Sequence, residues 1–285
     1  MSDATLPPGS PLSMDPRAIA IIGVGRMGAA LARGLISAGY PAAAIRAFDS
    51  DPERLKRARE MGATAGESAA EAVASADVII VAVKPADVPA VLAEIGPHLT
   101  VRQTVLSIAA GVTTRALRSD LPADCPAGVV RAMPNTPCVV GEGMSVVALD
   151  SPASAEGIAA AKQVLGAAGR VVELPENLLD AATGLSGSGP AYVFTFIQAL
   201  ADGGVAAGLP RAVAVELAAQ TLVGAARMVL AQEGHPEHLK DLVMSPGGTT
   251  AAGIAALEGR AFRAATMEAV IAAWRRAREL GGDNP

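Results

Sequence analysis

Short runs of Ile, Val and Ala alternate with longer amphipathic stretches from Arg17 to about Val172. Such runs predict buried strands and the stretches between them predict helices, an order that forms a parallel sheet covered on both faces. This part of the chain is therefore predicted to be a doubly wound α/β domain. The expected strands are Ala18–Ile22, Ile45–Phe48, Val78–Val83, Thr104–Ile108, Gly128–Arg131, Met144–Ala148 and Arg170–Glu173. The expected helices begin at Met27, Pro52 and Ala86, with another from about Ala153 to Ala167.

The strand pattern stops after about Asn177, and the remaining chain is rich in Ala, Leu and Val at helical spacing. Gly and Pro are expected to separate the helices at 187–190, 208–210, 234–236 and 245–248. These helices carry more apolar surface than one subunit can bury, so we expect them to form a homodimer. The expected domains are a disordered tail over 1–16, a dinucleotide-binding domain over 17–176 and a helical dimerisation and substrate-binding domain over 177–285.

Composition excludes several classes of protein. With 51% hydrophobic and 18% charged residues among 285, the chain is expected to be globular. A net charge of −5 and 2% aromatic residues disfavour binding to nucleic acid. No uninterrupted apolar run has the length of a bilayer helix, and the first sixteen residues lack the order of a secretory signal, so we expect a cytoplasmic protein without a membrane role. Cys125 and Cys138 are expected to be reduced thiols rather than a disulfide.

A glycine-rich turn, Gly23-Val24-Gly25-Arg26-Met27-Gly28, follows the first expected strand and opens a helix. Glycines at this spacing permit a tight turn, close approach of a pyrophosphate and close helix packing, and Asp49 follows about twenty residues later, where a dinucleotide's adenosine ribose binds. We therefore expect a dinucleotide site here, the alternative being a structural turn.

Asp49 bears on the choice of cofactor. A carboxylate pairs with the ribose hydroxyls of NADH and repels the 2′-phosphate of NADPH, whereas the nearby Arg46, Arg54 and Arg57 attract that phosphate. The sequence favours NADH without excluding NADPH. In the alternative interpretation, Asp49 or Asp51 only caps the helix that begins at Pro52.

Two further segments follow strands, where ligands of this architecture bind. Lys84, in Ala82-Val83-Lys84-Pro85, is expected to point toward the cofactor or the substrate carboxylate, unless it is a solvated surface lysine. Asn135 lies between two prolines in the segment 131–137, which we expect to hold the nicotinamide carboxamide or close the site, unless it is only a turn. The small residues of 185–192 predict either packing against the sheet domain or ligand contact.

The segment Ser245-Pro246-Gly247-Gly248-Thr249-Thr250 runs directly into an alanine-rich helix. Backbone N–H groups and hydroxyls that meet at the start of a helix form an anion site, so we expect a small acid to bind here. Two histidines, His235 and His238, lack a further strong ligand, so no metal site is expected. Cys138 is expected to be a buried thiol rather than a nucleophile.

These segments together resemble the successive signatures of the pyrroline-5-carboxylate reductase family, which carries out the last step of proline biosynthesis. The resemblance covers Arg17 to about Leu280, is most specific over 241–250, and rests on Gly23–Gly28, Ala82–Pro85, Ser107–Val112, Arg131–Pro137, Gly184–Tyr192 and Lys240–Thr250.

The resemblance implies a Rossmann domain joined to an all-α dimerisation domain, with dimers often assembled into a ring such as a decamer. It implies hydride transfer from NADPH or NADH to the C=N bond of 1-pyrroline-5-carboxylate. The family often has a small polar residue at the position of Asp49 and usually prefers NADPH, so this chain departs from the family there.

The resemblance also implies roles for particular residues. Thr250 and Lys84 are the catalytic candidates, with Thr250 hydrogen-bonded to the ring nitrogen. The substrate-binding set is Ser245, Gly247, Gly248, Thr249 and Thr250. The cofactor-binding set is Gly23, Gly25, Arg26, Met27, Gly28, Asp49, Ser50, Ala82, Val83, Lys84, Pro85 and Asn135.

Two other functions compete with this hypothesis. A hydroxyacid dehydrogenase of similar build usually has a lysine on the first long helix of its second domain, but 184–209 contains no Lys. A noncatalytic dinucleotide sensor has no need of the acid site at 245–250.

Overall fold

The computed structural model describes residues 17–231 and 234–281, and the expected tail over 1–16 lies outside them. Two compact units make up the chain. The first consists of Met1–Ser188 together with Ala272–Pro285, and the second is Gly189–Ile271. The domain boundary expected after residue 176 coincides with the end of the strands, whereas the compact units divide between Ser188 and Gly189.

An eight-stranded sheet in the order β3-β2-β1-β4-β5-β6-β7-β8 forms the centre of the first unit. The strands are β1 (Ile19–Ile22), β2 (Ile45–Phe48), β3 (Thr64–Ala65), β4 (Val78–Val81), β5 (Thr104–Ser107), β6 (Gly128–Met133), β7 (Gly143–Ala148) and β8 (Gly169–Leu174). Neighbouring strands from β3 to β6 are parallel, and β1 pairs with both β2 and β4. Strands β1, β4 and β5 are buried along their whole length, which explains their continuous apolar sequences.

The sheet differs from the expected all-parallel order at one place. Strand β7 is antiparallel to β6, while β7 and β8 are parallel. The β6–β7 connection contains only the short 3₁₀ helix η4 (Thr136–Val140). A return to a parallel strand needs a crossover of a dozen or more residues, so this short connection turns the chain back antiparallel.

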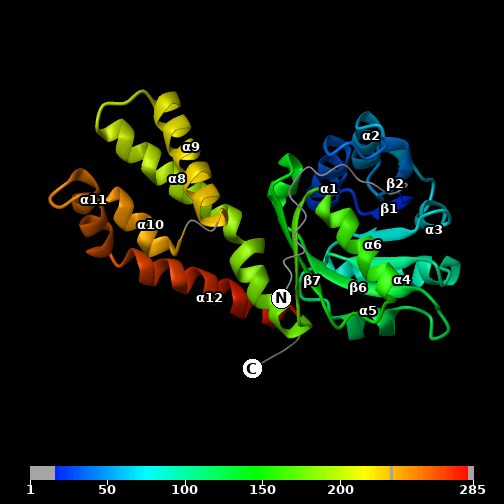
Figure 1. Cartoon of the computed structure of the whole chain (residues 1–285). Helices are drawn as coiled ribbons and strands as arrows, with labels where there is room; N and C mark the ends of the chain where they lie inside the picture. Colours follow the sequence, from blue (N-terminus) through cyan, green and yellow to red (C-terminus); the bar gives the residue numbers. More distant parts are fainter. Residues whose placement is uncertain (1–16, 232–233, 282–285) are drawn as a thin grey trace. The chain divides into compact units, whose positions relative to one another are not determined.

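Helices cover both faces of this sheet (Figure 1). Apolar residues of α1 (Arg26–Ser37) and α6 (Ala155–Gly166) join one buried cluster, and residues of α3 (Ala69–Val73), α4 (Val88–Ile95) and α5 (Thr114–Asp120) join the other. Helix α2 (Pro52–Glu60) starts where expected, because Pro52 occupies its first turn and the Asp51 side chain accepts a hydrogen bond from Glu53 N. The remaining short helical turns are η1 (Ala42–Ala44), η2 (Pro85–Asp87), η3 (Gly96–His98) and η5 (Glu176–Leu178).

In the described part of the chain after β8, all regular elements are helices, as predicted. Its elements are α7 (Leu179–Ala182), the π-helical turn η6 (Thr183–Gly187), α8 (Gly189–Ala206), α9 (Arg211–Leu230), α10 (Pro236–Val243), α11 (Thr249–Glu258) and α12 (Phe262–Leu280). The breaks expected near residues 208, 235 and 246 are present.

The break expected at 187–190 is short: η6 ends at Gly187, Ser188 is a bend, and α8 begins at Gly189 with Pro190 in its first turn. Pro190 has no N–H to donate to the carbonyl four residues before it. A π-type hydrogen bond from Ser188 N to Thr183 O, at 2.9 Å, carries the helix past this point.

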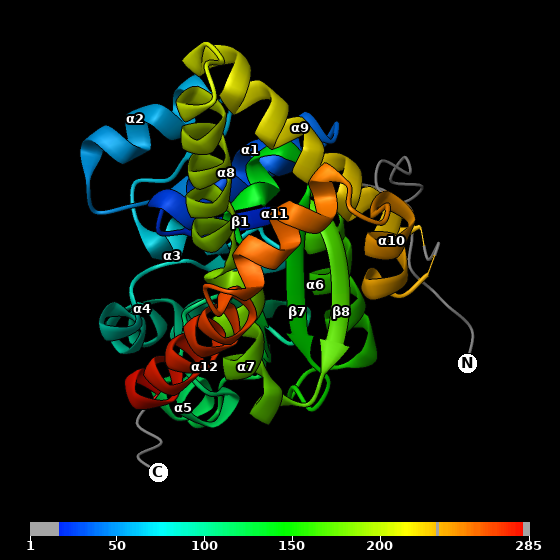
Figure 2. The same cartoon turned by 90° about the vertical axis from the view of Figure 1, so that its left-hand side faces the viewer.

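In the second unit, α8 and α9 pack side by side (Figure 2). Phe196 and Phe262 have ring centroids 5.5 Å apart, and the Tyr192 hydroxyl donates to Ala269 O at 3.4 Å. Helix α9 is long and apolar enough to span a membrane by length and composition, with a mean hydropathy of 1.5. Only 11% of its apolar window is buried within the chain.

Candidate cofactor and substrate sites

The glycine turn between β1 and α1 has the geometry predicted for a dinucleotide site. Gly23 has a φ of +95°, and a Cβ there would lie 2.8 Å from Val83 Cγ1 and 2.9 Å from the Ala82 carbonyl carbon. A Cβ on Gly28 would lie 2.0 Å from Gly23 O, so close packing of helix on turn requires glycine. At Gly25 the nearest atom to such a Cβ is Arg54 Nη1 at 4.0 Å, which leaves this backbone open to a ligand.

Helix α1 begins directly at this turn, and in the described structure no side chain caps its first N–H groups. Those groups can therefore bind a pyrophosphate. The structure thus brings the glycine turn together with Ala82 and Val83, two of the other cofactor candidates. Of the other cofactor candidates here, Arg26, Ser50, Lys84 and Pro85 are exposed and Met27 packs against the core.

Asp49 lies at the end of β2 with a buried carboxylate. Its Oδ2 accepts a hydrogen bond from Val24 N at 2.7 Å, and its Oδ1 accepts one from Asp51 N at 2.9 Å. Arg54 Nη1 lies 3.4 Å from Oδ2, and Arg54 Nε lies 3.3 Å from Asp51 Oδ2. Asp51 is thus the cap of α2, whereas Asp49 ties the glycine turn to β2 and stands beside Arg54.

Asn135 is buried in the connection between β6 and β7. Its Oδ1 accepts from Met144 N at 2.8 Å, and its Nδ2 donates to Ser186 O at 3.0 Å. Ser186 O is the carbonyl that would accept from residue 190 in a regular helix, and Pro190 has no N–H. Asn135 therefore satisfies a carbonyl in the π-helical turn and leaves one amide hydrogen for a ligand.

A buried ionic network, which the sequence analysis did not identify, lies next to this loop. Arg131 on β6 contacts Glu176 Oε1 at 3.2 Å and Asp180 Oδ1 at 2.9 Å. Glu176 Oε1 also accepts from Thr114 N at 2.7 Å, and Thr114 Oγ1 lies 2.5 Å from Glu176 Oε2. The network joins β6 to the start of α5 and to α7, and it fixes the strand that leads into the Asn135 loop.

A cavity of about 630 Å³ opens onto this network. Its lining residues are Thr113, Arg131, Asp150, Glu176, Asn177, Leu178, Asp180, Ala181, Trp274 and Arg278. Arg278 stands over the Trp274 ring at 5.7 Å from its centroid. Arg131 is paired with Glu176 and Asp180, and Asp150 Oδ1 accepts from Glu176 N at 2.9 Å.

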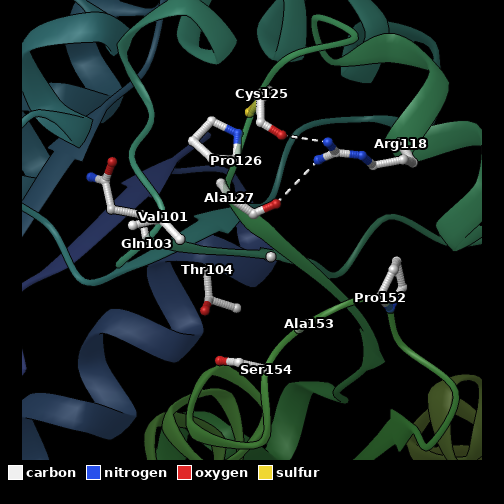
Figure 3. Close-up of a pocket in the computed structure, with 11 residues that line it drawn as sticks. Val101, Gln103, Thr104, Arg118, Cys125, Pro126, Ala127, Pro152, Ala153 and Ser154 are labelled. Atoms are coloured by element: carbon white, nitrogen blue, oxygen red, sulfur yellow. Dashed lines mark hydrogen bonds between the residues drawn. The ribbon is translucent and has the colours of Figure 1, made fainter.

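A second cavity, of about 450 Å³, is drawn in Figure 3. Thr104 and Gly128, which start β5 and β6, line it, so it lies at the amino ends of these strands. The glycine turn follows the carboxyl end of β1, which is parallel to them. This cavity contains none of the predicted site residues. Arg118 points its guanidinium at the carbonyls of Cys125 and Ala127 there.

The predicted substrate segment belongs to the second unit, where it forms the turn between α10 and α11. Gly247 has a φ of +68°, and a Cβ on Gly248 would lie 2.3 Å from Ser245 Oγ. Gly248 N donates to Ser245 O at 3.0 Å, so this N–H serves the turn itself. Helix α11 starts at Thr249, and its N-terminus has no side-chain cap from any described residue. The N–H groups of its first turn can therefore bind an anion.

The remaining sequence candidates have structural explanations. Burial raises the pKa of the Cys138 thiol to about 11, which makes the reactive thiolate scarce at neutral pH. His235 precedes α10 and its Nδ1 accepts from Glu237 N at 3.3 Å. Among the described residues, no group of three or more His, Cys, Asp or Glu side chains forms a candidate metal site.

Two family models match the chain. Residues 176–280 match the family described as pyrroline-5-carboxylate reductase dimerisation, and residues 18–111 match the one described as NADP oxidoreductase coenzyme F420-dependent. The pyrroline-5-carboxylate reductase of Arabidopsis thaliana is 42% identical over 272 residues, covering 95% of this chain and 98% of the relative. The enzyme of the same name from Synechocystis is 50% identical over 211 residues, covering 74% and 78%.

Solved structures agree with these sequence matches. The Plasmodium falciparum pyrroline carboxylate reductase with NADP bound has a TM-score of 0.85 at 31% identity, covering 94% of this chain and 100% of that one. The pyrroline-5-carboxylate reductase of Coxiella burnetii has a TM-score of 0.84 at 33% identity, covering 93% and 99%. Prephenate dehydrogenase from A. aeolicus, at 17% identity and a TM-score of 0.51, shares the fold alone.

Proposed function

This chain belongs to the pyrroline-5-carboxylate reductase family, and we propose that it reduces 1-pyrroline-5-carboxylate to L-proline at the expense of NAD(P)H. The observation that carries this proposal is the uncapped start of α11 behind the Ser245–Gly248 turn. A reductase of a small acid needs such an anion site, and a dinucleotide sensor does not.

The first unit supplies the cofactor site. The open backbone at Gly25 and the first turn of α1 bind the pyrophosphate, while Gly23 and Gly28 allow the turn to pack against β1 and the backbone near Val83. The bound nicotinamide supplies the hydride. Lys84, exposed at the start of η2, and the remaining amide hydrogen of Asn135 shape the nicotinamide end.

The second unit supplies the substrate site. The N–H groups of Thr249, Thr250 and Ala251 and the hydroxyl of Ser245 hold the substrate carboxylate, because these N–H groups have no acceptor within α11. The hydroxyl of Thr250 orients the ring nitrogen of the imine and holds its proton. A protonated imine carbon is already electrophilic, so positioning accounts for most of the catalysis.

The buried Asp49 carboxylate favours NADH. It has a fixed geometry at the end of β2, where it can accept the adenosine ribose hydroxyls in addition to its backbone donors. Arg54 offsets part of its charge, so NADPH also binds, but less tightly.

The functional unit is a homodimer formed through the helical unit, and a ring such as a decamer is a further assembly of it. The match to a dimerisation family over 176–280 and the exposed apolar side chains of these helices support this proposal. The enzyme works in the cytoplasm.

The test is consumption of NADH or NADPH by the purified full chain when 1-pyrroline-5-carboxylate is added, with each cofactor at equal concentration. Rapid oxidation with proline as product is expected, and faster with NADH. If neither cofactor is oxidised by protein that binds a dinucleotide, the reductase function is contradicted. An equal or faster rate with NADPH would contradict the role given to Asp49.

A further inference from the structure

Arg263, at the start of α12, contacts the two helices that flank the substrate turn. Its Nη1 lies 2.7 Å from Glu237 Oε1, and its Nε lies 2.5 Å from Glu258 Oε1. Glu237 is in the first turn of α10, and Glu258 is the last residue of α11. Both carboxylates therefore stand at the helix ends farthest along the chain from the turn at 244–248.

We propose that Arg263 is a positioning residue for the substrate turn, which it controls by bridging the outer ends of α10 and α11. The two helices and the guanidinium close a triangle, with the turn at one corner and Arg263 on the opposite side. A triangle with two rigid sides has its angle fixed by the length of the third side. The bridge thus fixes the angle at which α11 presents its N-terminal N–H groups.

Helix α11 is long enough to transmit a change at Glu258 to the substrate turn. The ten residues of α11 span about 15 Å. When Glu258 shifts at one end, the whole helix rotates, and the N–H groups near Thr249 turn through the same angle. Hydrogen bonds weaken steeply as the donor turns away from its acceptor, so a rotated α11 would bind the substrate carboxylate less tightly. The bridge acts through this geometry, since exposed ion pairs contribute little to overall stability.

Two neighbours hold the bridge in place. Glu237 Oε2 accepts from Lys240 Nζ at 2.7 Å, so the two oxygens of Glu237 bind different cations. The hydrogen bonds from Arg263 and Lys240 lower the pKa of Glu237 to about 2, so the carboxylate stays charged even in acid that protonates an ordinary glutamate. Phe262, adjacent to Arg263, packs against Phe196 of α8 and anchors the start of α12.

The inference rests on the proposed role of the turn in binding the substrate carboxylate. Arg263→Met keeps the length of the side chain and removes the charge. It is expected to raise the KM for 1-pyrroline-5-carboxylate about three- to ten-fold, with kcat and the Kd for NADH within about two-fold. The double variant Arg263→Met with Glu258→Gln is expected to match Arg263→Met alone, because the bridge is already broken.

Arg211→Met is the matched control. Arg211 makes an exposed ion pair of 2.5 Å with Asp202 in the same unit, and that pair joins α8 to α9. This control is expected to leave the KM unchanged. Arg263→Lys keeps the charge but lacks the planar guanidinium that donates to both carboxylates. Its KM is expected to lie between those of the parent protein and Arg263→Met.

Hydrogen exchange of the peptide over 244–252 in the ligand-free protein separates this inference from the proposed function. Faster exchange in Arg263→Met than in Arg211→Met supports the bridge even if the protein does not reduce 1-pyrroline-5-carboxylate. In active protein, an unchanged KM with unchanged exchange would overturn the proposal. So would a loss confined to kcat and thermal stability, since that describes a purely structural residue.

Discussion

At the scale of single residues, Asp49 has two tasks that a substitution can separate. Asparagine retains one oxygen that can accept from Val24 N, so Asp49→Asn should keep the contact with the glycine turn, while it removes the charge and the acceptor for Asp51 N. We expect the ratio of kcat/KM for NADPH to that for NADH to rise about ten-fold, or about 1.4 kcal/mol. Asp51→Asn, at the cap of α2, is the control and should leave the ratio unchanged. Equal ratios in all three proteins would show that Asp49 has no part in cofactor choice.

Thr250 permits a similar separation of binding from turnover. Thr250→Ala removes the hydroxyl proposed to orient the imine nitrogen, whereas the backbone N–H of the residue remains. We expect kcat to fall about 10- to 100-fold, with a smaller change in the Kd for NADH. Thr250→Ser keeps the hydroxyl and should retain most of the activity. Equal losses in turnover and cofactor binding by the alanine variant would remove Thr250 from the chemical step.

The candidate site residues that the sequence analysis found lie close together along the chain. The glycine turn and the segment 245–250 are recognisable from local spacing, and the structure shows that both have glycine-dependent backbone geometry. Their roles in binding stay predictions. The ion pairs of Arg131 and Arg263 were missed, because Glu176 lies 45 residues from Arg131 and Glu237 lies 26 residues from Arg263. No local pattern distinguishes such an arginine from a solvated one.

At the scale of secondary-structure elements, the Arg131 network joins β6 to α7 and α5. Arg131→Met would leave Glu176 and Asp180 as partly buried charges without their cation. Breaking a buried pair in this way usually costs about 3–5 kcal/mol, so we expect a loss of this order in the free energy of unfolding. Urea unfolding at fixed protein concentration measures it. Arg276→Met, which removes an exposed pair with Glu279, should cost less than about 1 kcal/mol.

The features that the sequence analysis missed have causes that apolar periodicity does not report. Strand β3 has two residues and α3 has five, which is too short for a periodic signal. The direction of β7 depends on the length of its connection, which apolar periodicity does not report. Pro190 lies in the first turn of α8, as expected, but the π turn before it and the hydrogen bond from Asn135 to Ser186 O depend on contacts that the local sequence does not report.

At the scale of the whole molecule, the two units differ in where their apolar side chains lie. The sheet of the first unit has two large buried clusters, whereas few residues of the second unit are buried within this chain. The large exposed apolar residues of the second unit are Val193, Phe194, Leu200, Leu209, Val213, Val215, Leu217, Val223, Met228, Val229, Leu230, Leu242, Val243, Phe262, Met267 and Ile271. A partner chain that covers them also explains the membrane-like composition of α9.

Leu217 offers a test of that partner. It lies within α9 and is 53% exposed in the single chain. In a homodimer with two-fold symmetry each interface residue occurs twice, so Leu217→Arg places two like charges in one apolar contact. Isolated buried charges cost several kcal/mol each, which is enough to dissociate a dimer at micromolar concentration.

We therefore expect sedimentation of Leu217→Arg to shift from an oligomer toward the monomer, with a lower and more concentration-dependent Tm than the parent protein. Val101→Arg is the matched control, since Val101 is 77% exposed but belongs to the first unit. That variant should sediment like the parent. A parent protein that is already monomeric, or a Leu217→Arg variant that remains fully assembled, would contradict an interface through α9. The exposed face of this helix would then need another occupant.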